Sequence, residues 1–262
     1  MRIRRLAIAG VALAAAIGLS GCGTDKDAPS GAGTATGPAA EQAAQPADPA
    51  TELAAAATKL GEDSVKVRTS MAAGLNAEGA VDKAGDKMDM TMTLGEGDKG
   101  MKVAMRKVGA DIYMKFDGAL GSMLGARTGK WMHIDAAKVP AGSAFSMENN
   151  DPKSAAKLIA AASQVRKTGD RSYQGVLDMT KGPNANADLQ KLGAKAQAVP
   201  FTAEADDQGR LVKLVIDVAA IAPTAGKMTT EYYDFGSPVS VQAPPSSQVV
   251  EMPKEMLGLV NA

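Results

Sequence analysis

Alternation of apolar and polar side chains is the feature that most restricts how this 262-residue chain can fold. It is clearest in Lys87–Leu94, where three methionines and a leucine take alternate positions. Successive side chains of a β-strand point to opposite faces of the sheet, so this pattern predicts a strand with one apolar face. The pattern recurs in residues 101–105, 112–116 and 131–134, with glycines between the runs. The sequence therefore predicts an antiparallel meander whose turns are formed at glycine.

The remainder of the folded region predicts more strands and a few helices. Helical spacing of apolar residues follows the capping pair Asp48-Pro49, and two further helices are predicted in residues 152–162 and 186–196. Alternation predicts further strands at 65–69, in a pair spanning 165–179, and at 200–206, 211–217 and 227–235. We expect roughly nine or ten strands and two or three helices. Many antiparallel strands with few helices indicate an α+β fold in which one curved sheet carries helices on its concave side.

The start of the chain has the order of a secretory signal. Arginines at positions 2, 4 and 5 precede an apolar run, Leu6–Leu19, that is too short to span a membrane. The run leads into Leu19-Ser20-Gly21-Cys22, which contains the one cysteine of the chain and resembles the lipobox of bacterial lipoproteins. The resemblance implies that residues 1–21 are a cleaved signal peptide and that Cys22 is acylated. The alternative is an ordinary cleaved signal followed by a free cysteine.

Composition separates a tether from a domain. Residues 22–48 are rich in Ala, Gly, Pro and Thr without apolar periodicity, which predicts a flexible linker, and residues 49–262 are predicted to fold. The 29 basic and 29 acidic residues of the chain balance, and removal of the signal peptide with its arginines leaves a mildly acidic protein. Nucleic-acid binding needs a basic surface, so nucleic acid is not expected as a partner.

Four segments behind the cysteine and the linker carry a family resemblance. They are ADIYMKF (110–116), GKWMHID (129–135), VPFTAEADDQGRLVKLVID (199–217) and TTEYYDFGSPVSVQAPP (229–245). The chain resembles the actinobacterial lipoproteins of the LppX, LprA, LprF and LprG type, whose fold is similar to the LolA and LolB lipoprotein carriers. The resemblance implies a LolA-like antiparallel half-barrel with helices across its mouth and an apolar cavity that takes acyl chains of lipids or glycolipids. It carries over no catalytic residues.

Methionine is concentrated on one face of the predicted sheet. An unbranched thioether side chain adapts to ligands of variable shape, so we predict that this face lines a lipid cavity. The candidate cavity residues are Met88, Met90, Met92, Met101, Val103, Met105, Ile112, Met114 and Val215. Plain core packing is the alternative. Copper binding by the methionines is disfavoured, because residues two apart on one strand lie about 6.5–7 Å apart at Cα and neither His nor Cys accompanies them.

No arrangement of residues in the sequence indicates catalysis. His133 is the single histidine, and we interpret it as a structural or surface residue on the same strand face as Trp131 and Asp135. A catalytic histidine needs a nucleophile and an orienting partner, and no nucleophile motif is present. We therefore expect a protein that is not an enzyme and that needs no cofactor or metal.

The segment from Pro152 to Lys195 is locally basic. It contains eight basic and three acidic residues, a net charge of +5. If its two predicted helices border the cavity, their lysines would meet lipid headgroups or a membrane surface. The headgroup candidates are Lys153, Lys157, Lys191 and Lys195. Solvated helix faces are the alternative interpretation.

Together these features predict a lipoprotein anchored to the extracytoplasmic face of the cell membrane through acylated Cys22. It would bind, and transfer, lipids or glycolipids through the apolar cavity, with an envelope transporter as a possible partner. The alternative is an interaction or sensor module of the cell envelope built on the same fold. A small or filled cavity would favour that alternative.

Overall fold

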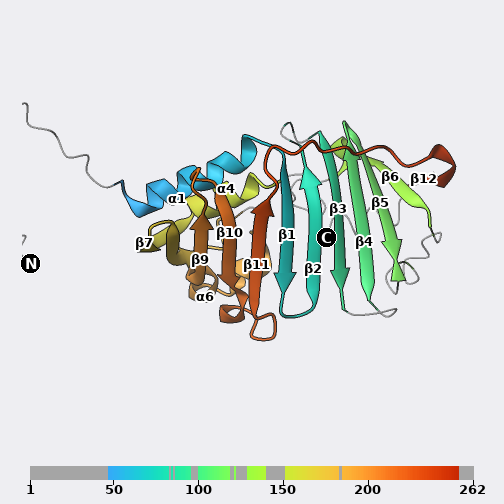
Figure 1. The fold of residues 1–262 in the computed structure, drawn as a ribbon. Coiled ribbons are helices and arrows are strands. Elements are labelled where there is room, and N and C mark those ends of the chain that lie inside the picture. Colours follow the sequence, from blue (N-terminus) through green and yellow to red (C-terminus); the bar gives the residue numbers. More distant parts are fainter. Residues whose placement is uncertain are drawn as a thin grey trace, which may run out of the picture. The chain divides into compact units, whose positions relative to one another are not determined.

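A broad β-sheet is the framework of the protein, and helices cover part of one of its faces (Figure 1). The structure is a computed structural model, and it describes residues 47–253 with gaps at residues 83, 85, 96–99, 119–120, 122–128, 140–150 and 183–184. All of these residues belong to one compact unit, Gln45–Ala262. The predicted signal peptide, Cys22 and nearly all of the predicted linker lie outside the described residues.

In the described part of the chain, twelve strands form the sheet. They are β1 (Val65–Met71), β2 (Leu75–Val81), β3 (Lys87–Leu94), β4 (Met101–Val108), β5 (Asp111–Asp117), β6 (Trp131–Asp135), β7 (Ala162–Gly169), β8 (Ser172–Leu177), β9 (Val199–Ala205), β10 (Leu211–Asp217), β11 (Lys227–Tyr233) and β12 (Val249–Glu251). Their order across the sheet is β12-β6-β5-β4-β3-β2-β1-β11-β10-β9-β8-β7. Neighbours are antiparallel, except that β12 runs parallel to β6. The predicted α+β class, with an open, curved and mainly antiparallel sheet, is confirmed.

The sheet consists of two meanders that meet in its middle. Strands β1 to β6 follow one another in chain order, as do β7 to β11, and antiparallel pairing of β1 with β11 joins the two series. The register of this pairing places Val67 opposite Tyr232. Glycine forms several of the turns, including Gly74 and Gly209 with φ angles of 84° and 69°. Residues with a Cβ rarely adopt such angles, which is why glycine predicted the turn at Gly209, whereas the turn at Gly74 was missed together with β2.

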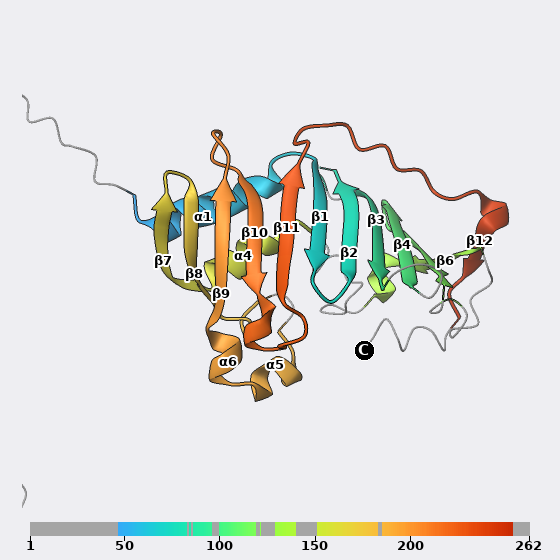
Figure 2. The same cartoon turned by 60° about the horizontal axis from the view of Figure 1, so that its bottom comes forward.

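Helices cover one half of the sheet rather than its full width. They are α1 (Pro49–Thr58), α4 (Ser154–Ala160), α5 (Ala187–Lys191) and α6 (Ala194–Gln197), with 3₁₀ turns η1 (Lys59–Gly61), η3 (Ala136–Lys138), η4 (Val218–Ala220) and η5 (Ser246–Gln248). The side chain of Asp48 caps α1 by accepting a hydrogen bond from the N–H of Thr51 (3.2 Å), as the sequence predicts. Helices α1 and α4 lie behind β7–β11. Helices α5 and α6 connect β8 to β9 in the chain and lie at one end of these strands (Figures 1 and 2).

The face of the sheet on which α1 and α4 pack is called the inner face here, and it carries two apolar clusters. The helix-covered cluster consists of Leu53, Ala56, Ala57, Leu60, Val65, Ala155, Ile159, Tyr173, Leu177, Val199, Phe201, Ala203, Leu211, Leu214, Ile216 and Tyr232. The methionine cluster consists of Val81, Met88, Met90, Val103, Met105, Ile112, Met114, Phe116, Met132, Ile134 and Met252. Val67, on the central strand β1, packs against both. The outer face is polar and carries ion pairs such as Arg106–Asp89 (2.8 Å).

Two strands of the sheet are absent from the sequence prediction. Strand β2 contains alanine and glycine, which have low strand propensity, and pairing with β1 and β3 determines its conformation. Strand β12 follows a proline-rich segment and pairs with β6 through Val249, Val250 and Glu251. It is a short strand at the edge of the sheet. Proline cannot donate a hydrogen bond to a neighbouring strand, so proline-rich segments are restricted to sheet edges.

Candidate ligand-binding pocket

An apolar pocket of about 250 Å³ lies on the inner face, where the helix-covered and methionine clusters meet. Strands β1, β2, β3, β10 and β11 form its sheet wall, and the N-terminal part of α4 with the residues before it forms the opposite wall. The lining residues are Val67, Thr69, Leu75, Ala77, Met90, Met92, Asp151, Pro152, Ser154, Ala155, Leu158, Leu214, Ile216, Met228, Thr230 and Tyr232. The pocket thus draws on both meanders and on α4.

Small residues on β2 leave room for this pocket. Ala77 and Gly79 are the inner-face residues at the centre of that strand, paired with Met92 and Met90 of β3. A Cβ added to Gly79 would lie 2.5 Å from the carbonyl oxygen of Asp89 and 3.0 Å from the Cα of Met90. Real Cβ atoms do not approach backbone atoms so closely, so β2 and β3 require glycine at this position. The middle of the sheet therefore carries little side-chain volume, and α4 does not fill the space.

A few polar groups accompany the apolar lining. The hydroxyls of Thr69 and Thr230, on paired positions of β1 and β11, lie 3.0 Å apart and hydrogen-bond to each other. Asp151 holds the turn into α4, because its side chain accepts from the N–H of Lys153 (2.8 Å) and its carbonyl accepts from the N–H of Ser154 (2.8 Å). Burial raises the pKa of Tyr232, so its phenol stays protonated. An apolar pocket with few polar groups is typical of small-molecule sites.

The structure divides the methionines that the sequence assigned to a cavity. Met90 and Met92 line the pocket. Met88, Met105 and Met114 are almost completely buried inside the methionine cluster, together with Val103 and Ile112. Met101 is partly exposed at the start of β4. For most of this set the structure matches the alternative of core packing, and the pocket lies at one border of the methionine face.

Val215 lies on the outer face, not in the pocket. In β10 the side chains of Leu214 and Ile216 point into the pocket, and alternation along the strand turns Val215 the other way. There Val215 borders a second depression of about 200 Å³ with Gln174, Thr202 and Lys227. The sequence assigned Val215 to the wrong face because three consecutive apolar residues, Leu214–Ile216, hide the phase of the alternation.

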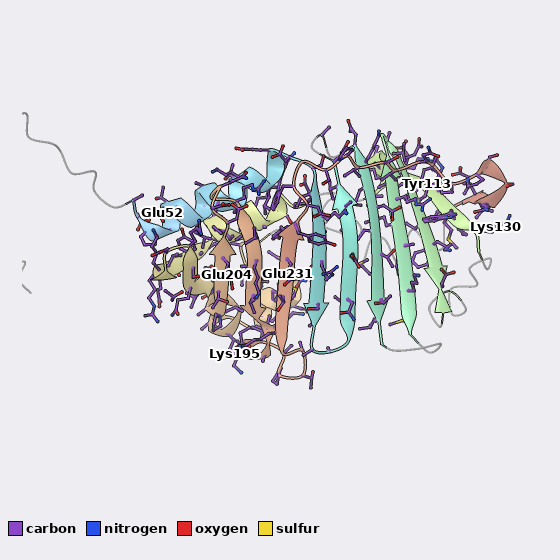
Figure 3. All side chains as sticks on the ribbon, viewed as in Figure 1. Glu52, Tyr113, Lys130, Lys195, Glu204 and Glu231 are labelled. Carbon is purple, nitrogen blue, oxygen red and sulfur yellow. The ribbon has the colours of Figure 1, made fainter. Side chains whose placement is uncertain are left out.

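The four candidate headgroup lysines do not converge on the pocket. Lys157 belongs to α4, and Lys153 is the residue before this helix. The carbon chain of Lys153 lies against Gly61. Lys191 pairs with Asp188 (2.8 Å) on α5. Lys195 belongs to α6, and Figure 3 labels it at the lower end of the strands. The two pairs therefore occupy separate surfaces, and neither pair lines the pocket.

His133 joins three strands on the outer face. Its Nε2 lies 2.7 Å from Oδ1 of Asp111 on β5, and its Nδ1 lies 2.9 Å from Oε1 of Glu251 on β12. The ring centroids of His133 and Tyr113 are 5.3 Å apart. These contacts support the interpretation of His133 as a structural residue. Among the described residues, no group of three or more His, Cys, Asp or Glu side chains could hold a metal ion.

Sequence reasoning missed the β1–β11 wall of the pocket, namely Thr69, Met228, Thr230 and Tyr232. Residues 228, 230 and 232 alternate with polar ones in Lys227–Tyr233, so the strand itself was predictable. The identity of its neighbour in the sheet was not predictable, because β1 and β11 are far apart in sequence. Only the pairing of β1 with β11 assembles this wall.

Comparison with protein-family models finds no match, and comparison with curated proteins finds none. In the part of the chain that the structure describes, no helix is long and apolar enough to cross a membrane.

Proposed function

We propose that this protein binds an acyl chain of a lipid or glycolipid in the pocket between its two apolar clusters, and that it carries no enzymatic activity. The observation that supports this most directly is the apolar lining contributed by Met90, Met92 and Met228. Methionine side chains adjust their shape, so a pocket bordered by them suits a chain that itself has many conformers. The resemblance to LolA-like lipoproteins supports the same function.

The volume of the pocket bounds what it can hold. About 250 Å³ is just below the 300–1,000 Å³ range of small-molecule sites, so the pocket fits a short chain or the end of a longer one. Repacking of Met92 and Leu158, both partly exposed on its walls, would lengthen the space available. Binding of one chain segment is the part of lipid handling that this geometry supports.

We further propose that acylated Cys22 holds the protein on the extracytoplasmic face of the cell membrane. Two or three acyl chains, each contributing about 0.8 kcal/mol per buried methylene, give stable anchoring. Residues 22–48 would then act as a linker, and the folded residues 49–262 would reach lipids or an envelope transporter beside the membrane.

An interaction or sensor module of the cell envelope is the second candidate function. The observation that favours it is the small volume of the pocket, together with the almost complete burial of Met88, Met105 and Met114 in the core. Such a protein would use its polar outer face for a partner and would leave the pocket empty.

Blocking the pocket tests the lipid proposal. The assay uses the full chain carrying Cys22→Ser and follows displacement of the neutral fluorescent probe N-phenyl-1-naphthylamine by methyl octanoate. Added to this background, Ala77→Trp and Met92→Trp should each abolish the displacement, because the indole fills the pocket. Asn76→Trp is the matched control, since residue 76 is exposed on the opposite face of β2. Unchanged binding by folded blocked variants, or no binding by the parent protein, would reject the pocket as a lipid site and favour the second candidate.

A further inference from the structure

Tyr232 is a buried polar residue for whose hydroxyl the described residues provide no partner. It lies on the inner face of β11, lines the pocket and is 7% exposed. Among the described residues, no hydrogen bond joins its hydroxyl to another group, in contrast to Tyr173 and Tyr233. Their hydroxyls donate to Glu52 and Glu78, each at 3.0 Å.

This missing hydrogen bond is energetically significant. A buried hydroxyl without a hydrogen-bond partner destabilises a protein, and buried tyrosine hydroxyls normally have one. The neighbouring Thr69 and Thr230 hydrogen-bond to each other across the β1–β11 pair, and neither forms a hydrogen bond with the hydroxyl of Tyr232. A molecule that enters the pocket with an oxygen acceptor would supply the missing partner.

The charges around the pocket restrict the kind of acceptor. Among the described residues that line it, Asp151 is the one charged residue, and none is a lysine or arginine. A carboxylate ligand would therefore be buried without a cationic partner and near a negative charge, which is costly. A neutral acceptor such as an ester carbonyl meets no such penalty.

We infer that Tyr232 is a specificity-determining residue that donates a hydrogen bond to a neutral ester carbonyl of the bound chain. The inference rests on the proposed function, that the pocket takes an apolar chain. It adds that the pocket distinguishes an esterified chain from a hydrocarbon and from a free carboxylate. A phenol that stays protonated is suited to this role as donor.

A ligand series of similar length tests the inference by competition against N-phenyl-1-naphthylamine in the full chain carrying Cys22→Ser. Methyl octanoate should bind about tenfold more tightly than decane, because one hydrogen bond to an otherwise unsatisfied group is worth about 1.4 kcal/mol. Octanoate at pH 8 should bind more weakly than the ester. Tyr232→Phe should bind decane at least as well as the parent protein and should lose the preference for the ester.

Tyr233→Phe is the matched control, because Tyr233 is the next residue and donates to Glu78 on the outer face. It should leave the ratio of ester to alkane affinity unchanged. Equal binding of ester and decane by the parent protein, or tighter binding of octanoate, would overturn the inference while leaving the proposed function standing. Binding of none of the three ligands would overturn both.

An infrared measurement tests the same hydrogen bond without a substitution. The carbonyl stretch of methyl octanoate labelled with ¹³C at the carbonyl should move to lower frequency on binding, relative to the ester dissolved in hexane. A bound ester whose carbonyl stretch matches that in hexane would overturn the inference even where Tyr232→Phe fails to fold.

Discussion

Single ionised side chains hold the polar margins of this sheet, and Asp206 is the best example. In the β9–β10 hairpin its carboxylate accepts from the N–H groups of Gln208 (3.0 Å) and Arg210 (2.8 Å) and from Nε of Arg210 (2.8 Å). The guanidinium of Arg210 in turn lies 4.1 Å from the ring centroid of Phe235. Burial by itself would raise the pKa of Asp206, but the hydrogen bonds from Arg210 outweigh it and hold the pKa below its ordinary value. The hairpin is thus stabilised by an ionised carboxylate.

Asp206→Asn should lower the free energy of unfolding at pH 7 by about 1–3 kcal/mol, because it removes charge-assisted hydrogen bonds. A lowered pKa in the folded state stabilises the protein above the pKa of the unfolded state, and this contribution is lost as the pH falls through the folded value. The difference between parent and variant in urea unfolding should therefore shrink below about pH 4.

Glu204→Gln is the control for this prediction. Glu204 lies on the same hairpin and forms an exposed pair with Lys213 at 3.8 Å, so its loss should cost less than about 1 kcal/mol. Equal destabilisation by the two substitutions would contradict the role assigned to Asp206. Figure 3 labels Glu204 on β9 and Glu231 on β11.

Among the described strands, β12 has the shortest ladder with its neighbour in the sheet. Its three residues pair with β6, and the next residue, Met252, donates its N–H to the carbonyl of His133 (3.0 Å) and packs into the methionine cluster. Glu251 on β12 and Asp111 on β5 both accept from the ring of His133 only when that ring carries two protons. Attachment of β12 is therefore coupled to the protonation of one histidine.

The coupling has a defined sign. Burial alone would lower the pKa of His133, but the hydrogen bonds and charges of Asp111 and Glu251 raise it above its ordinary value. A raised pKa in the folded state gives stabilisation that is complete below the unfolded value, about 6.5, and is lost as the pH rises through the folded value. We expect β12 to be held most firmly in mildly acidic solution.

Because the chain has one histidine, its NMR titration is unambiguous. The pKa of His133 should lie above 6.5, and Glu251→Gln should lower it. The single tryptophan, Trp131, pairs with Val249, so its emission should shift to the red as β12 loosens above the folded pKa. Glu231→Gln, on the outer face in the middle of the sheet, should leave both readings unchanged. A pKa at or below 6.5 would contradict the proposed coupling.

At the scale of the whole molecule, anchoring and ligand binding are assigned to separate parts of the chain. The pocket is built from residues between Val67 and Tyr232, whereas the predicted acylation site is Cys22. The two functions should therefore be separable by one substitution.

Cys22→Ser should release the protein from the membrane fraction into the soluble fraction, because the acyl chains can no longer form on the side chain. Displacement of N-phenyl-1-naphthylamine by methyl octanoate should be the same for the released protein and for the anchored protein in detergent. Retention of the variant in the membrane would contradict acylation at Cys22. Loss of binding by a folded variant would contradict the separation of anchor and pocket.

The sequence by itself determined most of the local structure. Period-two alternation predicted strands such as Lys87–Leu94, and turn glycines such as Gly209 predicted the hairpins between them, because both depend on backbone geometry at neighbouring residues. The cap at Asp48 follows from an equally local feature, whereas the contacts of His133 join residues 22 and 118 positions away and needed the tertiary structure. The same alternation could not find β2, whose alanine and glycine residues have low strand propensity.

Only the tertiary structure decided which residues form the pocket. Alternation defines two faces but not which of them is inner, so Val215 was assigned to the wrong one. It also leaves strand neighbours undefined, and the β1–β11 pair joins residues such as Thr69 and Thr230 that are 161 positions apart. Tyr232 therefore became a candidate ligand contact only once β1 and β11 were seen to be neighbours.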